Sequence, residues 1–366
     1  MKKYHSTRNS QYNSIEWIWT YYPKSTLLDQ VHIFHDRSQP LRIAALEEPI
    51  FYGPSKFKLE DLDSGWDDTP VDILLGHSPV NENEVKAIEQ SDFFNHLKPT
   101  RHYFPLFFLY YTFANSGHFS ENSHRNLDYT PFCRWTYYCR APRIHRYIFL
   151  NEASKNELLN SNIYTFNREY FSLSALQKLY SRFNYSPSYF DYKDRKYRHD
   201  KHRGGTLESD NTADQSFLHS AIQIAAETTY EYNFFTEKTF LPILLGKPVI
   251  VHGAYKANRA LESLGFRLYD NIIDYSFDDI ENVVLRTKSL VEQLTTLQYY
   301  KDPISIFNEC KDIAEFNKRH ALDLLRNGKG IPYKLIEWLN DKNENQQDLH
   351  IMFSWWYKYL DRLSIL

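Results

Sequence analysis

Short apolar segments alternate along the chain with longer segments of helical periodicity. This alternation is typical of parallel β-sheets with helices on their faces, so the sequence predicts an α/β fold. The strands expected in the N-terminal part are residues 31–35, 42–46, 71–75 and 103–107. Those expected further along are residues 132–138, 163–166, 221–226 and 249–251, with helices at 144–159, 258–264 and 280–297.

A polar, turn-rich segment at residues 115–126 divides the chain. At 366 residues the chain is longer than one hydrophobic core usually serves, which favours two domains. We therefore expect an N-terminal α/β domain over 1–126 and a second α/β domain over 127–340. Residues 341–366 carry a helical apolar stripe, which predicts a helix that packs across both domains. A helix that lies on a membrane surface is the alternative.

The composition narrows the class of protein. A formal net charge of −3 argues against a surface that binds nucleic acids in general. The three cysteines are an odd number without metal or redox spacing, which favours free thiols in a reducing compartment. The N-terminus is polar, and no run of about 18 uncharged apolar residues occurs. We therefore expect neither secretion nor a membrane-spanning anchor, and a cytoplasmic location.

The chemistry is concentrated around residues 221–253. The apolar run 221–226 predicts a strand that ends on Glu227, and the loop after it brings Glu237 and Lys238 to the start of a helix. Free N–H groups and the helix dipole favour an anion at such a start. A carboxylate can bind two ribose hydroxyls, and a lysine can hold a diphosphate. This stretch therefore predicts a nucleotide-sugar site.

The same stretch resembles the signature of the α1,3-fucosyltransferase family. Members of that family carry Glu-Asn-Ser, a short variable stretch, Asp-Tyr-Ile-Thr-Glu-Lys, a helix and a Val-Pro-Val-Val strand. The register matches without a gap. Thr236, Glu237 and Lys238 are identical to the motif, Glu227 matches its leading Glu, and residues 248–251 resemble its closing strand. A similar Thr-Glu-Lys-Thr-Phe pattern occurs in uncharacterised glycosyltransferase-like proteins of large viruses and phages.

Two positions depart from the family pattern. Thr228 stands where the family has Asn, and Phe234 stands where it has Tyr. A side-chain amide and a phenol hydroxyl near the nucleotide are therefore absent, which leaves the base and the sugar of the donor open.

The resemblance implies a GT-B glycosyltransferase, with two Rossmann-like domains that face a cleft. It implies transfer of a fucose-like sugar from GDP-fucose to the hydroxyl of a glycan or another acceptor, with inversion. Glu237 would hold the ribose and Lys238 the diphosphate, with Glu227, Thr228 and Phe234 beside the nucleotide. If the protein is viral, its location would be the host cytoplasm.

A basic loop at residues 140–146 lies between an expected strand and an expected helix, where Rossmann-like domains bind phosphate. Arg140 and Arg143 can each present a bidentate guanidinium to a diphosphate. Arg146 either shares that face or points into solvent. The alternative is a solvated helix start. The resemblance supports the first interpretation, because the family has a basic strand-to-helix loop at its donor diphosphate.

An inverting transfer needs a base that removes the proton of the acceptor hydroxyl. Glu47 and Glu48 follow an expected strand, at the edge where α/β domains build sites, and resemble a Glu-rich stretch that carries the proposed base of the family. The sequence does not choose between them. Both carboxylates are equally well explained as solvated or loop-capping groups.

A basic run at residues 193–203 holds six Lys or Arg side chains against two Asp. It predicts a solvated loop or, alternatively, a contact to a nucleic acid, which would extend sugar transfer to modified DNA bases. No Asp-X-Asp pair ends a strand, so we expect an enzyme without a metal or other cofactor beyond its donor sugar. A protein that binds sugar nucleotides without turnover is the alternative from another class.

Overall fold

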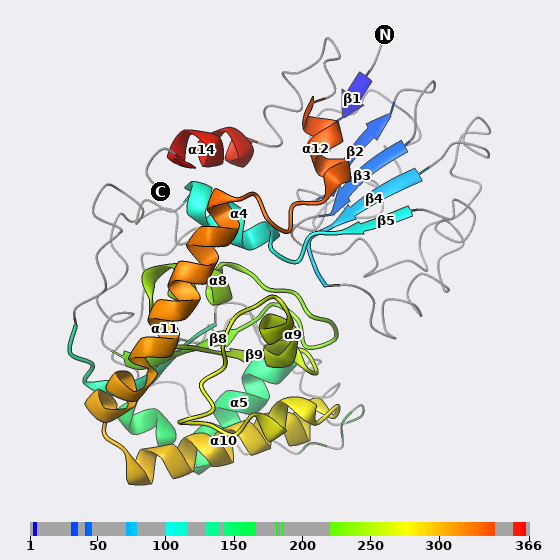
Figure 1. Ribbon diagram of the computed structural model, residues 1–366. Helices are drawn as coiled ribbons and strands as arrows, with labels where there is room; N and C mark the ends of the chain where they lie inside the picture. Colours follow the sequence, from blue (N-terminus) through cyan, green and yellow to red (C-terminus); the bar gives the residue numbers. More distant parts are fainter. Residues whose placement is uncertain are drawn as a thin grey trace. The chain divides into compact units, whose positions relative to one another are not determined.

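The computed structural model describes residues 3–5, 31–35, 41–45, 71–78, 100–115, 129–139, 143–165, 181, 183, 185, 220–340 and 354–363. The chain forms two compact units (Figure 1). The first comprises Met1–Ala114 and Leu325–Leu366, and the second comprises Asn115–Leu324. The first unit thus contains residues from both ends of the chain, whereas the sequence predicted an N-terminal domain over 1–126 alone.

The first unit holds a mixed sheet in the order β1-β2-β3-β4-β5. Its strands are β1 (Lys3–His5), β2 (Val31–His35), β3 (Leu41–Ala45), β4 (Val71–Leu75) and β5 (Thr100–Tyr103). The pairings of β1 with β2 and of β2 with β3 are antiparallel, and those of β3 with β4 and of β4 with β5 are parallel. The structure therefore has strands at or within one residue of three expected positions, which are residues 31–35, 42–46 and 71–75.

The expected strand at 103–107 is wrong. Strand β5 ends at Tyr103, and residues from Phe107 form helix α4 (Phe107–Asn115). The apolar run here is continuous, and a continuous run does not distinguish a buried strand from a buried helix. Pro105 lies in the turn between them, and α4 is buried on most sides, from Phe107 to Tyr110 and again at Phe113.

The second unit is built on an all-parallel sheet in the order β7-β6-β8-β9. Its strands are β6 (Cys133–Tyr138), β7 (Ile163–Thr165), β8 (Ser220–Ala226) and β9 (Val249–His252). All four were expected within a few residues. The chain places β7 on one side of β6 and then β8 and β9 on the other. The order of strands therefore reverses between β6 and β8.

Helices cover this sheet, and Figure 1 shows α5 (Ile144–Lys155) and α10 (Val283–Tyr300) below β8 and β9, with α8 (Glu237–Leu245) above. Helix α5 packs against α10. The described part of this unit also contains α9 (Ala257–Ser263) and most of α11 (Pro303–Arg326). Because both faces are covered, every residue of β8 is buried, as a continuous apolar strand requires.

The core of the second unit lies between the sheet and helices α5, α10 and α11. Its largest fully buried aromatic side chains include Trp135, Tyr137 and Phe149, which pack with Ile222 and Ile250. The rings of Tyr137 and Phe149 stack at 4.0 Å between centroids. Burial of this many aromatic and aliphatic groups gives the sheet a fixed frame on which loops after the strands can carry polar groups.

The C-terminal helices α12 (Tyr333–Asn340) and α14 (Ser354–Leu363) belong to the first unit. Tyr359 of α14 donates a hydrogen bond to the carbonyl oxygen of Leu325 at 2.6 Å, and Arg362 donates to the carbonyl oxygen of Phe113 at 2.7 Å. The expected packing of this helix across two domains stays a prediction. Within the described part of the chain, every helix is too short or too polar to cross a bilayer.

Candidate functional site

The carboxyl ends of β6 and β8 mark the most promising place for a site in the second unit. In an open parallel sheet, ligands bind outside the carboxyl ends of the strands, where the strand order reverses. Here that point lies between β6 and β8. The chain leaves β6 to begin α5 at Ile144, and it leaves β8 at Glu227 to begin α8 at Glu237.

Helix α8 begins with a cap that is itself held by a carboxylate. Thr236 is the N-cap residue, and its hydroxyl oxygen accepts a hydrogen bond from the backbone N–H of Lys238 at 3.3 Å. Glu227 accepts from the backbone N–H of Thr236 at 2.9 Å and from its hydroxyl at 2.7 Å. The hydroxyl of Thr239 donates to the same carboxylate at 2.5 Å. Glu227 therefore fixes the first turn of α8.

The carboxyl group of Glu227 is buried, with 1% of the residue exposed. Burial raises its pKa above the usual range, whereas the Lys238 ammonium and the hydrogen bonds from Thr236 and Thr239 lower the pKa. A buried carboxylate costs free energy unless hydrogen bonds satisfy it, and these three donors do so. The side chain acts on the helix start and does not reach solvent.

Glu237 and Lys238 lie at the surface of this helix start. The ammonium of Lys238 is 2.9 Å from Oε1 of Glu237 and 3.1 Å from the hydroxyl oxygen of Thr236. The side chain of Glu237 keeps 21% of its surface exposed, and that of Lys238 keeps 25%. One anionic and one cationic group are thus held beside each other with access to solvent, in the pairing that the sequence motif suggested.

The start of α5 presents an arginine to solvent. Arg143 is exposed and is the N-cap residue of α5, but its side chain makes no capping hydrogen bond to the helix. An exposed arginine at a helix start, beside the reversal of strand order, suits an anionic ligand.

Arg146 does not point into solvent, contrary to one of the expected alternatives. It is 3% exposed, and its Nη2 donates to the carbonyl oxygens of Ala226 and Glu227 at 2.7 Å each. His145 donates from Nε2 to the same carbonyl oxygen of Glu227 at 2.9 Å, because a carbonyl can only accept. The first turn of α5 therefore binds the last carbonyl group of β8 and that of the residue after it.

The end of β9 adds a further buried histidine. His252 accepts from the hydroxyl of Tyr137 at Nδ1 and donates from Nε2 to Thr287, each at 3.0 Å, because the Thr287 hydroxyl donates to a carbonyl oxygen. Burial, with Arg286 and Arg146, lowers the pKa of His252 to about 3, so the ring is neutral.

Gly253 allows close packing of β9 against Glu227. A Cβ atom at this position would lie 3.2 Å from Cβ of Glu227 and 3.4 Å from the carbonyl oxygen of Thr229. A side chain here would therefore push against the carboxylate that holds α8, which explains why glycine suits the position.

The remaining predicted site residues divide into two groups. Thr228 is half-buried at the start of the loop after β8, and Phe234 is 3% exposed, with its ring 6.2 Å from that of Tyr232. Phe234 therefore packs in the protein interior. Arg140, Glu47, Glu48 and the basic run 193–203 lie outside the described residues, and their roles stay predictions.

Sequence reasoning missed the groups that join the strands to the helices. The sequence pattern does not single out His145, which lies between two arginines. It also does not point to Arg286 of α10, which donates a hydrogen bond to the carbonyl oxygen of Gly253 at 3.1 Å. A pattern of charges along the chain cannot show which cation is buried. The available signal was the position of His145 and Arg146 directly before the apolar residues 147–150 of the same helix.

This arrangement can bind an anion and a polyhydroxyl group together. Arg143 and Lys238 come from the two helix starts beside the reversal of strand order, and Glu237 supplies an acceptor for hydroxyl groups. Comparison of the chain with models of known protein families, with curated proteins and with solved structures finds no match.

Proposed function

We propose that the protein is a glycosyltransferase that moves a sugar from a nucleotide-diphosphate sugar to an acceptor hydroxyl. The observation that carries the proposal is the partly exposed pair Glu237 and Lys238 at the start of α8, beside the point where the strand order reverses. Parallel α/β sheets bind nucleotides at such a point, with the phosphates at helix starts.

Each group has a role that its chemistry supports. The ammonium of Lys238 and the guanidinium of Arg143 offset the charge of the diphosphate, which grows on the leaving nucleotide as the bond to the sugar breaks. The carboxylate of Glu237 accepts hydrogen bonds from the ribose hydroxyls. Arg140 joins the diphosphate site in this proposal, and Glu47 or Glu48 serves as the base for the acceptor.

The proposal includes the GT-B architecture, with one α/β unit for the donor and another for the acceptor. The parallel sheet of the second unit supports the donor part of this assignment. Resemblance of residues 227–251 to the α1,3-fucosyltransferase signature supports GDP-fucose as the first donor to test, with inversion. The sequence has no Asp-X-Asp pair at the end of an expected strand, which supports transfer without a divalent metal.

Binding and turnover of the donor test this proposal. We expect the protein to bind a nucleoside diphosphate, and Lys238→Ala to weaken that binding about 10- to 100-fold, because a charge-assisted contact to phosphate is lost. The matched control is Lys311→Ala, which removes an exposed lysine from α11. The measurement is isothermal titration with ADP, CDP, GDP and UDP, followed by assays for hydrolysis or transfer of the corresponding sugar nucleotides.

Two outcomes would contradict the proposal. If the wild-type protein binds none of these nucleotides, or if both lysine variants bind them as tightly as the wild type, the site is wrongly assigned. Tight binding without hydrolysis or transfer to any acceptor would instead identify a protein that binds sugar nucleotides without turnover.

A further inference from the structure

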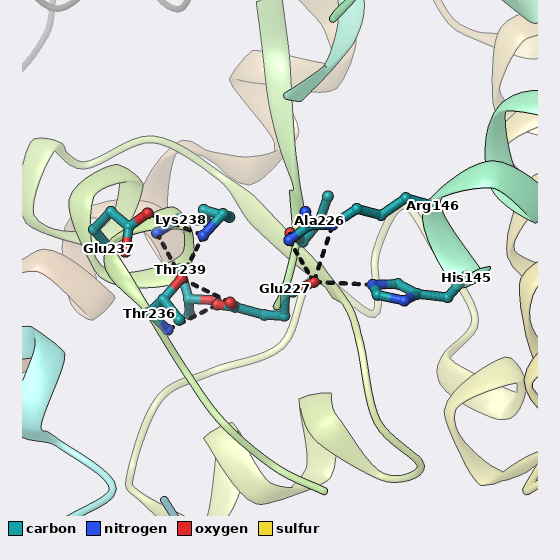
Figure 2. Close-up of polar contacts among 8 residues, drawn as sticks. All are labelled: His145, Arg146, Ala226, Glu227, Thr236, Glu237, Lys238 and Thr239. Atoms are coloured by element: carbon teal, nitrogen blue, oxygen red, sulfur yellow. Dashed lines mark hydrogen bonds and ion pairs between the residues drawn. The ribbon is translucent and has the colours of Figure 1, made fainter. Parts of the chain in front are cut away.

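Glu227 contacts two different helices through its main chain and its side chain. Its carbonyl oxygen accepts hydrogen bonds from His145 and Arg146 in α5. Its carboxylate accepts from Thr236 and Thr239 at the start of α8. Figure 2 shows the carboxylate and the carbonyl oxygen facing opposite ways. One residue therefore ties together the two helix starts beside the reversal of strand order.

The hydroxyl of Thr236 transmits the effect of Glu227 to Lys238. A threonine hydroxyl has one proton to donate and two lone pairs that accept. Thr236 donates its proton to Oε2 of Glu227 at 2.7 Å. Both lone pairs are then left for the backbone N–H of Lys238, at 3.3 Å, and for its ammonium, at 3.1 Å. The carboxylate thus sets the orientation in which Thr236 holds Lys238.

We propose that Glu227 is a positioning residue of the donor site, which acts through the hydroxyl of Thr236 to hold the Lys238 ammonium where a diphosphate binds. This inference rests on the proposed function, because the diphosphate is the ligand named there. Glu227 itself is 1% exposed, so it acts without touching the ligand.

The change Glu227→Gln separates this role from simple packing. Glutamine has nearly the same shape, but one of its terminal groups is an NH₂ that donates and cannot accept. Where that NH₂ faces Thr236, the threonine hydroxyl accepts a hydrogen bond from it. This uses one lone pair of the hydroxyl oxygen, and the hydroxyl proton loses its acceptor on residue 227. The backbone N–H and the ammonium of Lys238 then compete for the one lone pair that remains, so the ammonium is held less firmly. Hydrogen bonds that hold Thr239 and the backbone of Thr236 can still form to the amide oxygen.

A double-mutant cycle tests whether Glu227 acts through Lys238. We expect Glu227→Gln to weaken binding of inorganic pyrophosphate and of the best nucleoside diphosphate about 10-fold or more. In a protein that already carries Lys238→Ala, the same change should alter the affinity less than about 2-fold, because residues of one network are not additive. Equal losses in both backgrounds would overturn the positioning role.

The control is a second buried carboxylate in the same unit. Asp278 is 1% exposed and accepts from Asn258 and from the backbone N–H of Arg259 at the start of α9. Asp278→Asn removes a comparable acceptor from another helix start. We expect it to leave the affinity for pyrophosphate within about 2-fold of wild type. If it weakens binding as much as Glu227→Gln does, general loosening of the unit explains the effect and the positioning role is wrong.

Amide hydrogen exchange without ligand distinguishes failure of this inference from failure of the proposed function. We expect the backbone amide of Lys238, which depends on the hydroxyl of Thr236, to exchange about 10-fold faster in Glu227→Gln, while the amides of Thr236 and of β6 keep their wild-type rates. If exchange changes in this way but the wild type binds neither pyrophosphate nor any nucleotide, the proposed function and the donor-site role both fail. If the wild type binds and Glu227→Gln binds equally well, only the inference fails.

Discussion

The two ends of strand β8 each lie beside a lysine, and the two lysines differ in almost every physical respect. At the amino end, Lys247 is 0% exposed and donates to the carbonyl oxygen and to the hydroxyl of Ser220, each at 2.8 Å. At the carboxyl end, Lys238 keeps 25% of its side chain exposed and pairs with Glu237. One lysine is part of the interior, and the other is held at the surface.

The difference between the two lysines follows from their positions, because ligands bind at the carboxyl ends of parallel strands and not at the amino ends. Lys247 lies 5.5 Å from the ring centroid of Tyr129, and burial lowers the pKa of its amino group to about 7. At the other end, Thr236 and Glu227 hold Lys238 without burying it. The carboxyl ends of parallel strands are where ligands bind, so a charge kept accessible there is more informative about function than a charge buried at the opposite end.

The largest expected effect concerns the buried lysine. The pKa of Lys247 is about 7 in the folded protein and 10.5 in a model peptide. Between these pH values the unfolded chain binds a proton that the folded protein does not. The free energy of unfolding should therefore rise with pH across this window, by up to about 5 kcal/mol from this group. We expect Lys247→Met to remove that part of the slope.

Urea unfolding of the wild type and of Lys247→Met at pH 7, 8.5 and 10 measures this slope. Cys133 titrates in the same range and interacts with Lys247, so both proteins carry Cys133→Ala, and the contributions of the remaining groups cancel in the difference. The matched control is Lys311→Met, which changes an exposed lysine. If the free energy of unfolding changes equally with pH in the wild type and in Lys247→Met, burial does not lower the pKa of Lys247, and the two ends of β8 do not differ as we infer.

A smaller effect is expected from the neutral histidine beside the carboxyl end. His252 has a folded pKa of about 3, lowered by burial and by Arg286 and Arg146, against 6.5 in a model peptide. Below pH 6.5 the unfolded chain gains a proton that the folded protein excludes, so stability falls as the pH falls. At pH 5 this group should cost about 2 kcal/mol relative to pH 8. His252→Gln should reduce the loss by that amount.

Several titratable groups face His252, so the measurement must isolate its ring. They are Tyr137 from β6, His145 and Arg146 from α5, and Arg286 from α10. The pKa of His145 is also lowered by burial, which adds to the acid sensitivity in the same direction. NMR signals of the His252 ring should therefore show no protonation between pH 8 and 5. A midpoint near pH 6 would contradict the buried, neutral state.

The sequence predicted the sheet of the second unit well, because β8 and β9 are short, mostly apolar runs and β6 is rich in aromatic residues, which favour strands. It did not predict helix α11. The buried positions of this helix include Cys310, Ala314, Asn317 and Ala321, which are small or polar. The large apolar side chains of this helix that contact the core, Ile306, Phe307 and Ile313, are interspersed with these small and polar residues, which weakens the periodic signal.

The sequence placed the important site residues close together but assigned Glu227 a different task. The motif suggested a residue beside the nucleotide, whereas its carboxylate is buried and binds the first turn of α8. A sequence shows which residue types occur at which spacing. It does not show whether a carboxylate faces solvent or the helix that follows it, because that depends on how the loop between them folds.

The smallest expected effect concerns the surface lysine and bears directly on the comparison. Lys238 is partly exposed and its ion pair with Glu237 joins neighbouring residues, so it should add little to stability. We expect Lys238→Met to change the free energy of unfolding by less than about 1 kcal/mol at pH 8, measured by urea unfolding without ligand. A loss as large as that of Glu227→Ala, which strands three buried hydrogen-bond donors and should cost about 3 kcal/mol, would make Lys238 a structural cation. A small loss means that the fold holds this charge at the surface while gaining little stability from it, and a charge of that kind is available for a ligand.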